Sequence, residues 1–301
     1  MANLNSSAID PPVDRQSNRP SDLPEPTKIA KKKSWVPTIL IAISFIYLGL
    51  VLLIPAANVF VTAFSKGFSP ILAAVQRPDF QNAIKLTVSL AVIALPLNTI
   101  FGLSAAWAIA RNKFPGKAFL LSIIDLPFSI SPVVAGLMIV LLYGRLGWFG
   151  SWLEANDIKI IFAFPGMLLA TIFVSMPFIA REVIPVLDEM GTDQEEAART
   201  LGASDWQIFW KVVVPNIRWG LLYGLVLTNA RAMGEFGAVS VVSGNIANKT
   251  QSLPLFVEET YKQYETEVAY SAAVLLALLA VVTLVLKEIL ERRTHNSNAR
   301  E

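Results

Sequence analysis

Two ionisable residues, Arg231 and Glu235, lie inside an otherwise apolar stretch of the chain, residues 219–244. Their spacing of four residues places both on one face of a helix, where the side chains can form an ion pair. Isolated charges are costly in hydrocarbon, so ionisable residues within a membrane span either pair with each other or mark the path of an ion. The two residues therefore predict a buried structural contact or a polar point in a transport pathway.

Other side chains that commonly carry chemistry are almost absent. The sequence contains no cysteine and a single histidine, His295. Disulfide frameworks, iron–sulfur clusters and cysteine nucleophiles are excluded, and a histidine-based zinc site or a Ser-His-Asp triad is disfavoured. No glycine-rich phosphate-binding loop ending in Gly-Lys-Ser or Gly-Lys-Thr occurs, so we expect no ATP hydrolysis by this chain. The sequence predicts a protein that is not an enzyme and holds no cofactor or metal of its own.

The composition indicates a membrane protein. Of 301 residues, 54% are hydrophobic and 16% are charged, whereas about 25% of residues are charged in an ordinary soluble domain. So few charges cannot cover a compact body in water, and the apolar excess is expected to face a lipid bilayer. The net charge of +2 is too small to indicate a nucleic-acid partner. We predict an all-α membrane protein.

Six apolar segments are long enough to cross a bilayer, namely residues 36–63, 86–110, 118–143, 160–180, 219–244 and 268–286. If the N-terminus is inside, the inner loops and tails hold seventeen Lys and Arg residues and the outer loops hold seven. Lys and Arg accumulate on the cytoplasmic side of membrane proteins. The sequence therefore predicts six transmembrane helices with both termini cytoplasmic.

Two of these segments contain residues that disturb helices. Pro127 and Pro132 are expected to kink or break the third segment. Gly234 and Gly237 flank Glu235 in the fifth segment, where they permit close helix packing or local unwinding.

The two ends of the chain are predicted to be cytoplasmic tails. Residues 1–34 are rich in Pro, Ser, Asn and Asp and include a run of three lysines, so we expect disorder there. The apolar stretch that follows is too long for a signal peptide. Residues 35–287 are assigned to a transmembrane domain and residues 288–301 to the C-terminal tail.

The longest predicted cytoplasmic loop, residues 181–218, carries seven carboxylates and four basic side chains. Thr192 and Glu195 have the spacing of a capping box, which predicts the start of a helix. Gly202 ends this helix and can turn the chain in the left-handed conformation.

A second helix is predicted directly after that turn. Ser204 and Gln207 repeat the capping-box spacing and open a helix that Pro215 is expected to end. Its apolar face contains three aromatic residues, Trp206, Phe209 and Trp210. Residues 192–215 thus predict a helix-turn-helix elbow at the membrane surface.

The elbow carries a specific motif: Glu196-Ala197-Ala198, three residues, Gly202, nine residues, then Val212-Val213-Val214-Pro215. This pattern resembles the EAA loop of the permeases of ATP-binding-cassette (ABC) importers, with valines in place of Ile and Leu. The resemblance implies the type I ABC importer permease fold. It also implies that the elbow contacts an ATPase. The residues that shape this contact are Glu196, Ala197, Ala198, Gly202 and Pro215. Glu195 and Arg199 are candidate ion-pair partners of the ATPase, or members of a solvated helix face.

Further motifs resemble sulfate and molybdate permeases. Residues 228–243 include Gly-Glu-Phe-Gly-Ala, which recurs in the fifth helix of that family. The Asn-Ala-Arg before it, the later Ser252-Leu253-Pro254-Leu255 and the segments 125–128 and 131–136 look most like the W-type subunit of sulfate/thiosulfate importers. The likeness extends from about Phe80 to Lys287.

The resemblance implies partners for the chain. These are an ATPase dimer that binds ATP and Mg²⁺, a related but distinct sulfate permease subunit, and a periplasmic sulfate-binding protein. It also implies a multi-pass location in the bacterial inner membrane. The alternative within the same family is a molybdate or tungstate permease, which would usually work as a homodimer.

In this setting, the pair of ionisable residues has two interpretations. Arg231 and Glu235, with Ser240 and Ser243 further along the segment, could line a weakly binding path for a dianion. Alternatively, Arg231 and Glu235 form a structural pair that fixes helix packing, with Asp125 as a further member. The sequence leaves both interpretations open.

Overall fold

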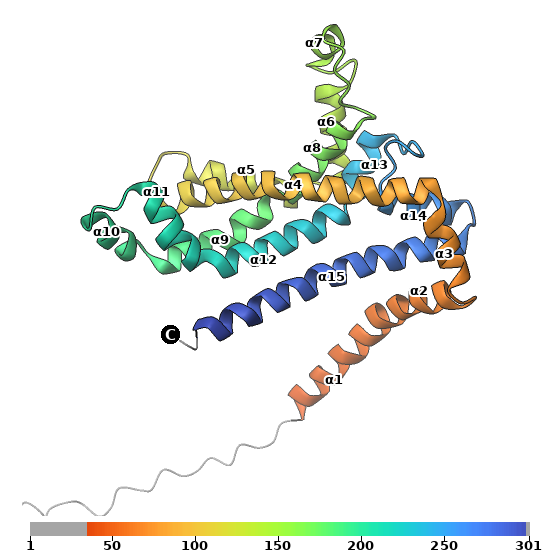
Figure 1. Ribbon diagram of the computed structural model, residues 1–301, viewed down its shortest axis with the longest axis horizontal. Coiled ribbons are helices and arrows are strands. Elements are labelled where there is room, and N and C mark those ends of the chain that lie inside the picture. The colour runs from red at the N-terminus through yellow and green to blue at the C-terminus, as the bar shows by residue number, and fades with distance from the viewer. Residues whose placement is uncertain (1–34, 299–301) are drawn as a thin grey trace, which may run out of the picture. The chain divides into compact units, whose positions relative to one another are not determined.

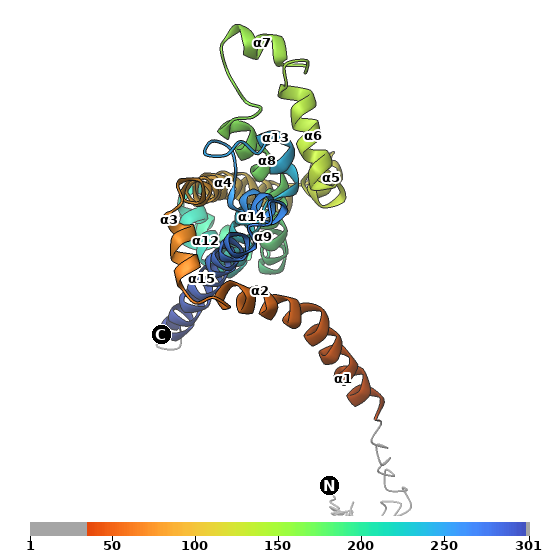
Figure 2. The ribbon, with the colours of Figure 1, turned by 90° about the vertical axis from the view of Figure 1, so that its right-hand side faces the viewer.

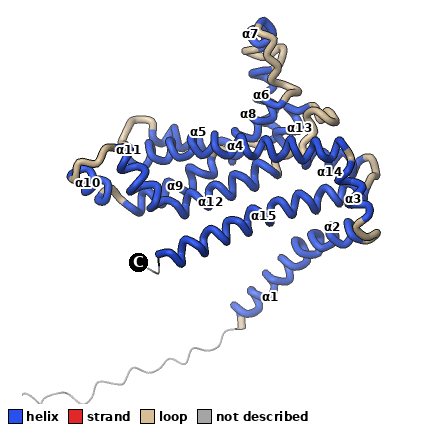
Figure 3. Tube along the Cα trace, in the orientation of Figure 1, coloured by secondary structure: helices blue, strands red, loops and turns tan. Residues whose placement is uncertain are grey.

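The computed structural model describes residues 35–298, and the predicted tail at residues 1–34 and residues 299–301 lie outside this part. All regular elements of the described residues are helices, and none is a strand (Figure 3). The chain divides into two compact units, Met1–Leu53 and Ile54–Glu301.

The described part of the first unit consists of α1 (Val36–Leu48) and the π-helical turn η1 (Gly49–Leu53). The first half of the second unit contains α2 (Ile54–Phe64), α3 (Ser69–Gln76), α4 (Pro78–Arg111), α5 (Lys117–Ser129), α6 (Pro132–Tyr143), α7 (Gly150–Ala155), α8 (Phe164–Ser175) and α9 (Pro177–Met190). Its second half contains α10 (Asp193–Thr200), α11 (Asp205–Ile208), the π-helical turn η2 (Phe209–Val213), α12 (Val214–Met233), α13 (Gly237–Ser243), α14 (Leu253–Lys262) and α15 (Thr266–Asn298).

The core of the second unit is built where α4, α9 and α12 pack against one another, with α15 beside α12 (Figure 1). Ala106 of α4, Ile179 and Val183 of α9 and Ile217 of α12 are buried there in one cluster. Close packing of such side chains supplies van der Waals attraction, which holds helices together where lipid rather than water surrounds them. Helices α10 and α11 lie at one end of this bundle, and α13 and α14 lie toward the other (Figure 1).

Three helical stretches in the described part of the chain are long and apolar enough to cross a membrane: Ile39–Phe64, Pro78–Arg111 and Phe164–Met190. They correspond to the first, second and fourth predicted segments. The fourth continues beyond its predicted end, so Arg181 and Glu182 belong to α9 and not to a loop.

The third predicted segment is broken, as its prolines indicated. Helices α5 and α6 are bent by 111° at a short break. Ser131 precedes Pro132 and has extended backbone angles (φ −57°, ψ 135°), because the proline ring disfavours the helical region for the preceding residue. Helix α6 carries α7 at its far end, away from α4 (Figures 1 and 2).

The fifth predicted segment is not one continuous helix. Helix α12 ends at Met233 and α13 begins at Gly237, so the chain unwinds around Glu235. The expectation of a single helix over residues 219–244 is therefore wrong, and the expected local unwinding is confirmed. The last predicted segment corresponds to α15, whose apolar part is Thr266–Val282. Helix α15 continues to Asn298, through most of the residues assigned to a C-terminal tail.

Glycine permits close packing of α6 against α13. A Cβ atom on Gly136 would lie 2.6 Å from the carbonyl oxygen of Ala238, and one on Gly237 would lie 2.8 Å from the Cβ of Pro132. Both distances are shorter than side-chain contacts allow. The two helices approach this closely because neither glycine has a side chain.

Candidate functional site

The elbow begins with α10, which forms where the sequence predicts a helix but without the predicted capping box. The backbone of Thr192 is already helical, and its hydroxyl donates a hydrogen bond of 2.8 Å to Oε1 of Glu196. Glu195 does not reach back to Thr192, because its carboxylate is turned toward the end of α4. The first capping box is thus a wrong prediction within a correctly predicted helix.

Glu195 forms an ion pair with Arg111, the last residue of α4. Nε of Arg111 donates to Oε1 of Glu195 at 2.7 Å, and its Nη1 donates to the carbonyl oxygen of Leu187 in α9 at 2.9 Å. The side chains of Arg111 and Glu195 are only 8% and 10% exposed. The structure therefore places Glu195 inside the protein, where it joins the elbow to α4 and α9. No local pattern reveals this partner, since the two residues are 84 positions apart.

The turn between the two elbow helices has the predicted form. Gly202 adopts a left-handed conformation with φ of +83°. Ser204 and Gln207 form a complete capping box: the Ser204 amide donates to Oε1 of Gln207 at 3.0 Å, and the Gln207 amide donates to Oγ of Ser204 at 3.4 Å.

The second elbow helix does not end at Pro215, as the sequence suggested. Helix α11 continues through η2 directly into α12, and Pro215 occupies the first turn of α12. The Val214 amide bonds to the carbonyl oxygen of Phe209, five residues earlier, as a π-helical turn requires. This wider turn accommodates a proline, which lacks an N–H and crowds the preceding turn of an α-helix. The elbow is consequently continuous with the helix that leads to Arg231.

The outer surface of the elbow combines charged, small and apolar side chains. Glu196, Ala197 and Gly202 are exposed, and Leu201 projects with 88% of its surface accessible. Arg199 donates to Asp205 at 2.7 Å across the turn, and both side chains are well exposed. On the inner side, Ala198 packs against the core cluster. This arrangement leaves a protruding edge that another protein could contact.

A cluster of aromatic side chains lies between the second elbow helix and α4. The ring of Phe209 lies edge-on to that of Trp107 in α4, with centroids 5.5 Å apart, and it also contacts Trp206 and Trp210. Phe209 of the predicted apolar face therefore packs onto α4, whereas Trp206 and Trp210 remain exposed.

Arg231 and Glu235 form the predicted ion pair, with Nη2 of Arg231 3.1 Å from Oε2 of Glu235. Glu235 is 2% exposed at its side chain, whereas Arg231 is 37% exposed. Oε1 of Glu235 accepts a hydrogen bond of 2.8 Å from the amide of Ala238, in the first turn of α13. Glu235 thus holds together the two helices on either side of the break, while its cation partner reaches a more open position.

The remaining predicted pathway residues are engaged in local contacts. Ser240 donates to the carbonyl oxygen of Gly237 at 2.8 Å, and Oγ of the buried Ser243 accepts from the amide of Asn245 at 3.1 Å. Asp125 is not part of this group, because it pairs with Arg181 of α9 at 2.7 Å.

Comparison with known proteins identifies the family of the chain. Residues 98–296 match the family described as binding-protein-dependent transport system inner membrane component. Over 264 residues, the chain is 67% identical to the sulfate transport system permease protein CysW of Synechocystis sp., covering 88% of this chain and 96% of that protein. It is also 37% identical over 247 residues to the sulfate transport system permease protein CysT of Escherichia coli, covering 81% and 89%.

A solved structure has the same fold. A chain from a bacterial ABC transporter involved in the import of alginate superposes with a TM-score of 0.74 at 18% identity, covering 86% of this chain and 96% of that one. At this identity, the likeness concerns the fold alone. The fold, the matched segment and the similarity to CysW over most of both proteins agree: the chain belongs to the binding-protein-dependent transport system inner membrane components, the permeases of ABC transporters.

Proposed function

We propose that this chain is a transmembrane permease subunit of an ATP-driven importer of sulfate and thiosulfate. The observation that carries the proposal is the 67% identity to CysW over nearly the whole length of that protein. The molybdate/tungstate alternative gains no support from the relatives compared above, because the names of both specify sulfate.

The proposed complex contains four kinds of component. This chain pairs with a related sulfate permease subunit, an assignment that the similarity to both CysW and CysT supports. A dimer of ATPase subunits binds ATP and Mg²⁺ on the cytoplasmic side, and a periplasmic sulfate-binding protein delivers the anion. The chain itself supplies neither an ATP site nor a cofactor.

The proposed orientation places the elbow and both termini in the cytoplasm of a bacterial cell, with the chain crossing the inner membrane six times. In this arrangement, each broken helix pair, α5–α6 and α12–α13, counts as one crossing, and α15 is the last. The excess of Lys and Arg in the predicted inner segments supports this orientation.

Coupling is proposed to run from the elbow into the membrane through two rigid connections. One is the buried ion pair between Arg111 and Glu195, which ties α10 to the end of α4. The other is the unbroken backbone from α11 through η2 into α12. When the ATPase dimer closes on ATP, it would move the surface formed by Glu196, Ala197, Arg199 and Gly202, and both connections would transmit the displacement.

The pathway is proposed to pass the break between α12 and α13. Arg231 offers a partly exposed guanidinium there, while Glu235 holds it in place and keeps the local net charge low. A fully unpaired cation would bind a dianion tightly and release it slowly. Ser240 and Ser243 are the proposed neutral polar groups beyond the break, on α13.

Competition between oxyanions tests the proposed cargo. Labelled sulfate uptake is measured in vesicles that contain the chain with its partner subunits, with unlabelled thiosulfate, molybdate or tungstate added. We expect thiosulfate to suppress uptake and low concentrations of molybdate to leave it unchanged. Uptake that prefers molybdate would refute the cargo assignment while leaving the family assignment in place.

A further inference from the structure

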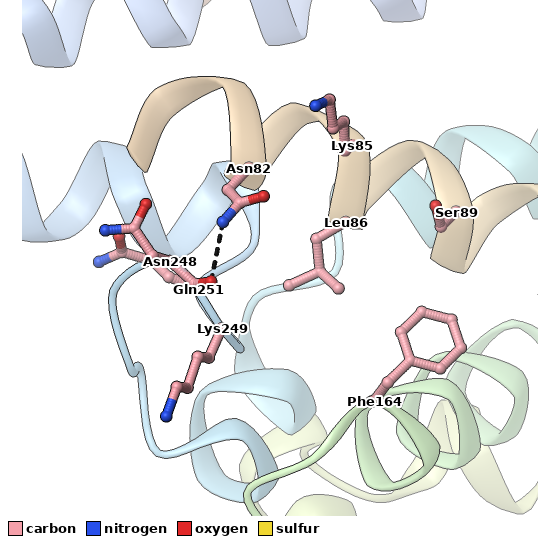
Figure 4. A pocket seen from close by; sticks show the side chains of 8 residues that line it. All are labelled: Asn82, Lys85, Leu86, Ser89, Phe164, Asn248, Lys249 and Gln251. Atoms are coloured by element: carbon pink, nitrogen blue, oxygen red, sulfur yellow. Dashed lines mark hydrogen bonds between the residues drawn. The ribbon is translucent and has the colours of Figure 1, made fainter. Parts of the chain in front are cut away.

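A small polar cavity of about 200 Å³ lies between the beginning of α4, the loop from residue 244 to residue 252, and the first residue of α8 (Figure 4). Its polar lining consists of Asn82, Lys85, Ser89, Asn248, Lys249 and Gln251. A water molecule takes a share of roughly 30 Å³ in the liquid. The cavity therefore has room for a small ion together with several waters.

Two hydrogen bonds hold the loop against α4 on either side of Lys85. Nδ2 of Asn82 donates to the carbonyl oxygen of Asn248 at 2.8 Å (Figure 4), and the amide of Leu253 donates to Oγ1 of Thr87 at 2.7 Å. These bonds join segments 166 residues apart in the sequence. The cavity is thus shaped by two elements that are fixed to each other.

The charge in the cavity is entirely positive. Lys85 and Lys249 both line it, and no carboxylate does. Among the residues that the structure describes, neither lysine has an ion-pair partner. Both lysines are exposed, and their ammonium groups extend to opposite sides of the cavity (Figure 4). They form an uncompensated positive rim, which raises the local concentration of anions.

Most other cations of the predicted outer loops are neutralised by carboxylates. Lys66 pairs with Glu267, Arg145 with Glu154 and Lys262 with Glu258. Arg77 donates hydrogen bonds to both Asp79 and Glu265, which raise the pKa of its guanidinium. The unpaired positive charge on this side is therefore concentrated at the cavity, with Lys159 as the exception.

Neutral hydrogen-bonding groups complete the lining. Gln251, a buried residue that is 6% exposed, lines the cavity, and Ser89 adds a hydroxyl from α4. Amide N–H groups and hydroxyls can donate to the oxygens of an anion. Together with two ammonium groups, they form a donor-rich recess suited to an oxyanion.

The cavity lies at the end of α4 that is remote from the elbow. Lys85 and Arg111 are 26 residues apart on this helix, or about 39 Å at 1.5 Å per residue. In the orientation proposed above, the elbow is cytoplasmic and the cavity faces the side from which the anion arrives.

We propose that this cavity is a receiving site for a tetrahedral dianionic oxyanion such as sulfate, where Lys85 and Lys249 hold the anion before it enters the path between the subunits. The inference rests on the proposed function, because the cargo and the sidedness come from it. Attraction by two flexible, hydrated ammonium groups provides capture without tight retention.

Lysine footprinting tests occupancy directly. The assembled importer is methylated reductively in sulfate or in chloride at equal ionic strength, and the modification rate of each lysine is measured by mass spectrometry. We expect sulfate to slow modification of Lys85 and Lys249 relative to Lys159. Equal rates in the two salts, or no reaction at either cavity lysine in the assembled importer, would overturn the proposal.

Transport by a double variant, Lys85→Gln with Lys249→Gln, provides the second test. Loss of the positive recess should lower sulfate uptake per assembled complex about tenfold, the lower end of the effect of electrostatic focusing. Lys159→Gln is the matched control, since Lys159 lines a different cavity that also contains Glu154 and Asp157, and it should change uptake less than twofold.

Three outcomes separate the possible failures. If the double variant weakens the complex with the binding protein as much as it lowers uptake, the lysines serve protein docking and the anion site is refuted. If the unmodified importer fails to take up sulfate at all, the proposed function fails. Normal uptake in the double variant beside a working unmodified importer would refute the receiving site alone.

Discussion

Arg111 and Glu195 form a buried ion pair that fastens the first helix of the elbow to the end of α4, with 2.7 Å between Nε and Oε1. The same guanidinium also donates to the carbonyl oxygen of Leu187, so one side chain connects α4, α9 and α10. A force applied to the elbow therefore reaches two helices of the bundle directly.

Breaking this pair on one side should destabilise the protein. Either Arg111→Met or Glu195→Leu leaves a buried charge without its partner, which typically costs about 3 kcal/mol or more. The double variant should cost less than the sum of the single changes, because no charge is left buried. The unfolding midpoint in detergent measures the effect.

Arg199→Met is the control: it breaks an exposed pair and should cost less than about 1 kcal/mol. Additive single effects would show that the pair is not coupled.

Replacing Gly202 should impair coupling beyond its effect on stability. Gly202→Ala forces a side chain into a left-handed conformation, at a cost of about 1 kcal/mol. Gly116→Ala carries the same penalty at another turn, with φ of +99° and equally open surroundings. Both variants should lose similar stability, but only Gly202→Ala should lower uptake per ATP hydrolysed. Equal coupling in the two variants would contradict a special role for the elbow turn.

Removing the cation from the broken helix tests the pathway. Arg231→Met should reduce sulfate uptake about fivefold or more while the subunits still assemble, because a charge-assisted contact contributes about 1 kcal/mol or more. Arg181→Met, which breaks another ion pair of this chain, serves as the control and should have a smaller effect on uptake. Assembly and uptake must be followed separately. Normal transport by Arg231→Met would leave Arg231 and Glu235 with a purely structural role.

Adding one methyl group between α6 and α13 should be destabilising. In Gly136→Ala, the new Cβ would lie 2.6 Å from the carbonyl oxygen of Ala238, and overpacking of this kind costs about 1–3 kcal/mol. Gly234→Ala is the matched control, because the nearest atom would lie at 3.4 Å and φ is −92°. We expect a clear fall in the unfolding midpoint for Gly136→Ala only. Similar midpoints would show that α6 and α13 can separate freely.

Local patterns in the sequence predict much of the site. The Ser204 capping box, the left-handed Gly202, the ion pair between Arg231 and Glu235 and the break near Pro132 each depend on residues a few positions apart. At such short range, backbone geometry determines which groups meet.

Contacts between distant segments could not be predicted in the same way. The partner of Glu195 lies 84 residues earlier, and only the packing of α4 against α9 brings it near. Likewise, Pro215 is expected to end the second elbow helix, because proline disrupts a helix interior. The helix continues instead, because a π-helical turn precedes the proline. The recess around Lys85 also depends on the hydrogen bond between Asn82 and Asn248, which are 166 residues apart.

The most direct test of the central claim is accumulation of labelled sulfate by vesicles that contain this chain with its partner permease, ATPase and binding protein. Sulfate is measured with ATP supplied to the ATPase side, with a non-hydrolysable analogue, and with this chain omitted. We predict accumulation against a concentration gradient only when both ATP and this chain are present. Sulfate that merely equilibrates at the same rate without ATP hydrolysis would contradict the account, because the elbow would then transmit no work.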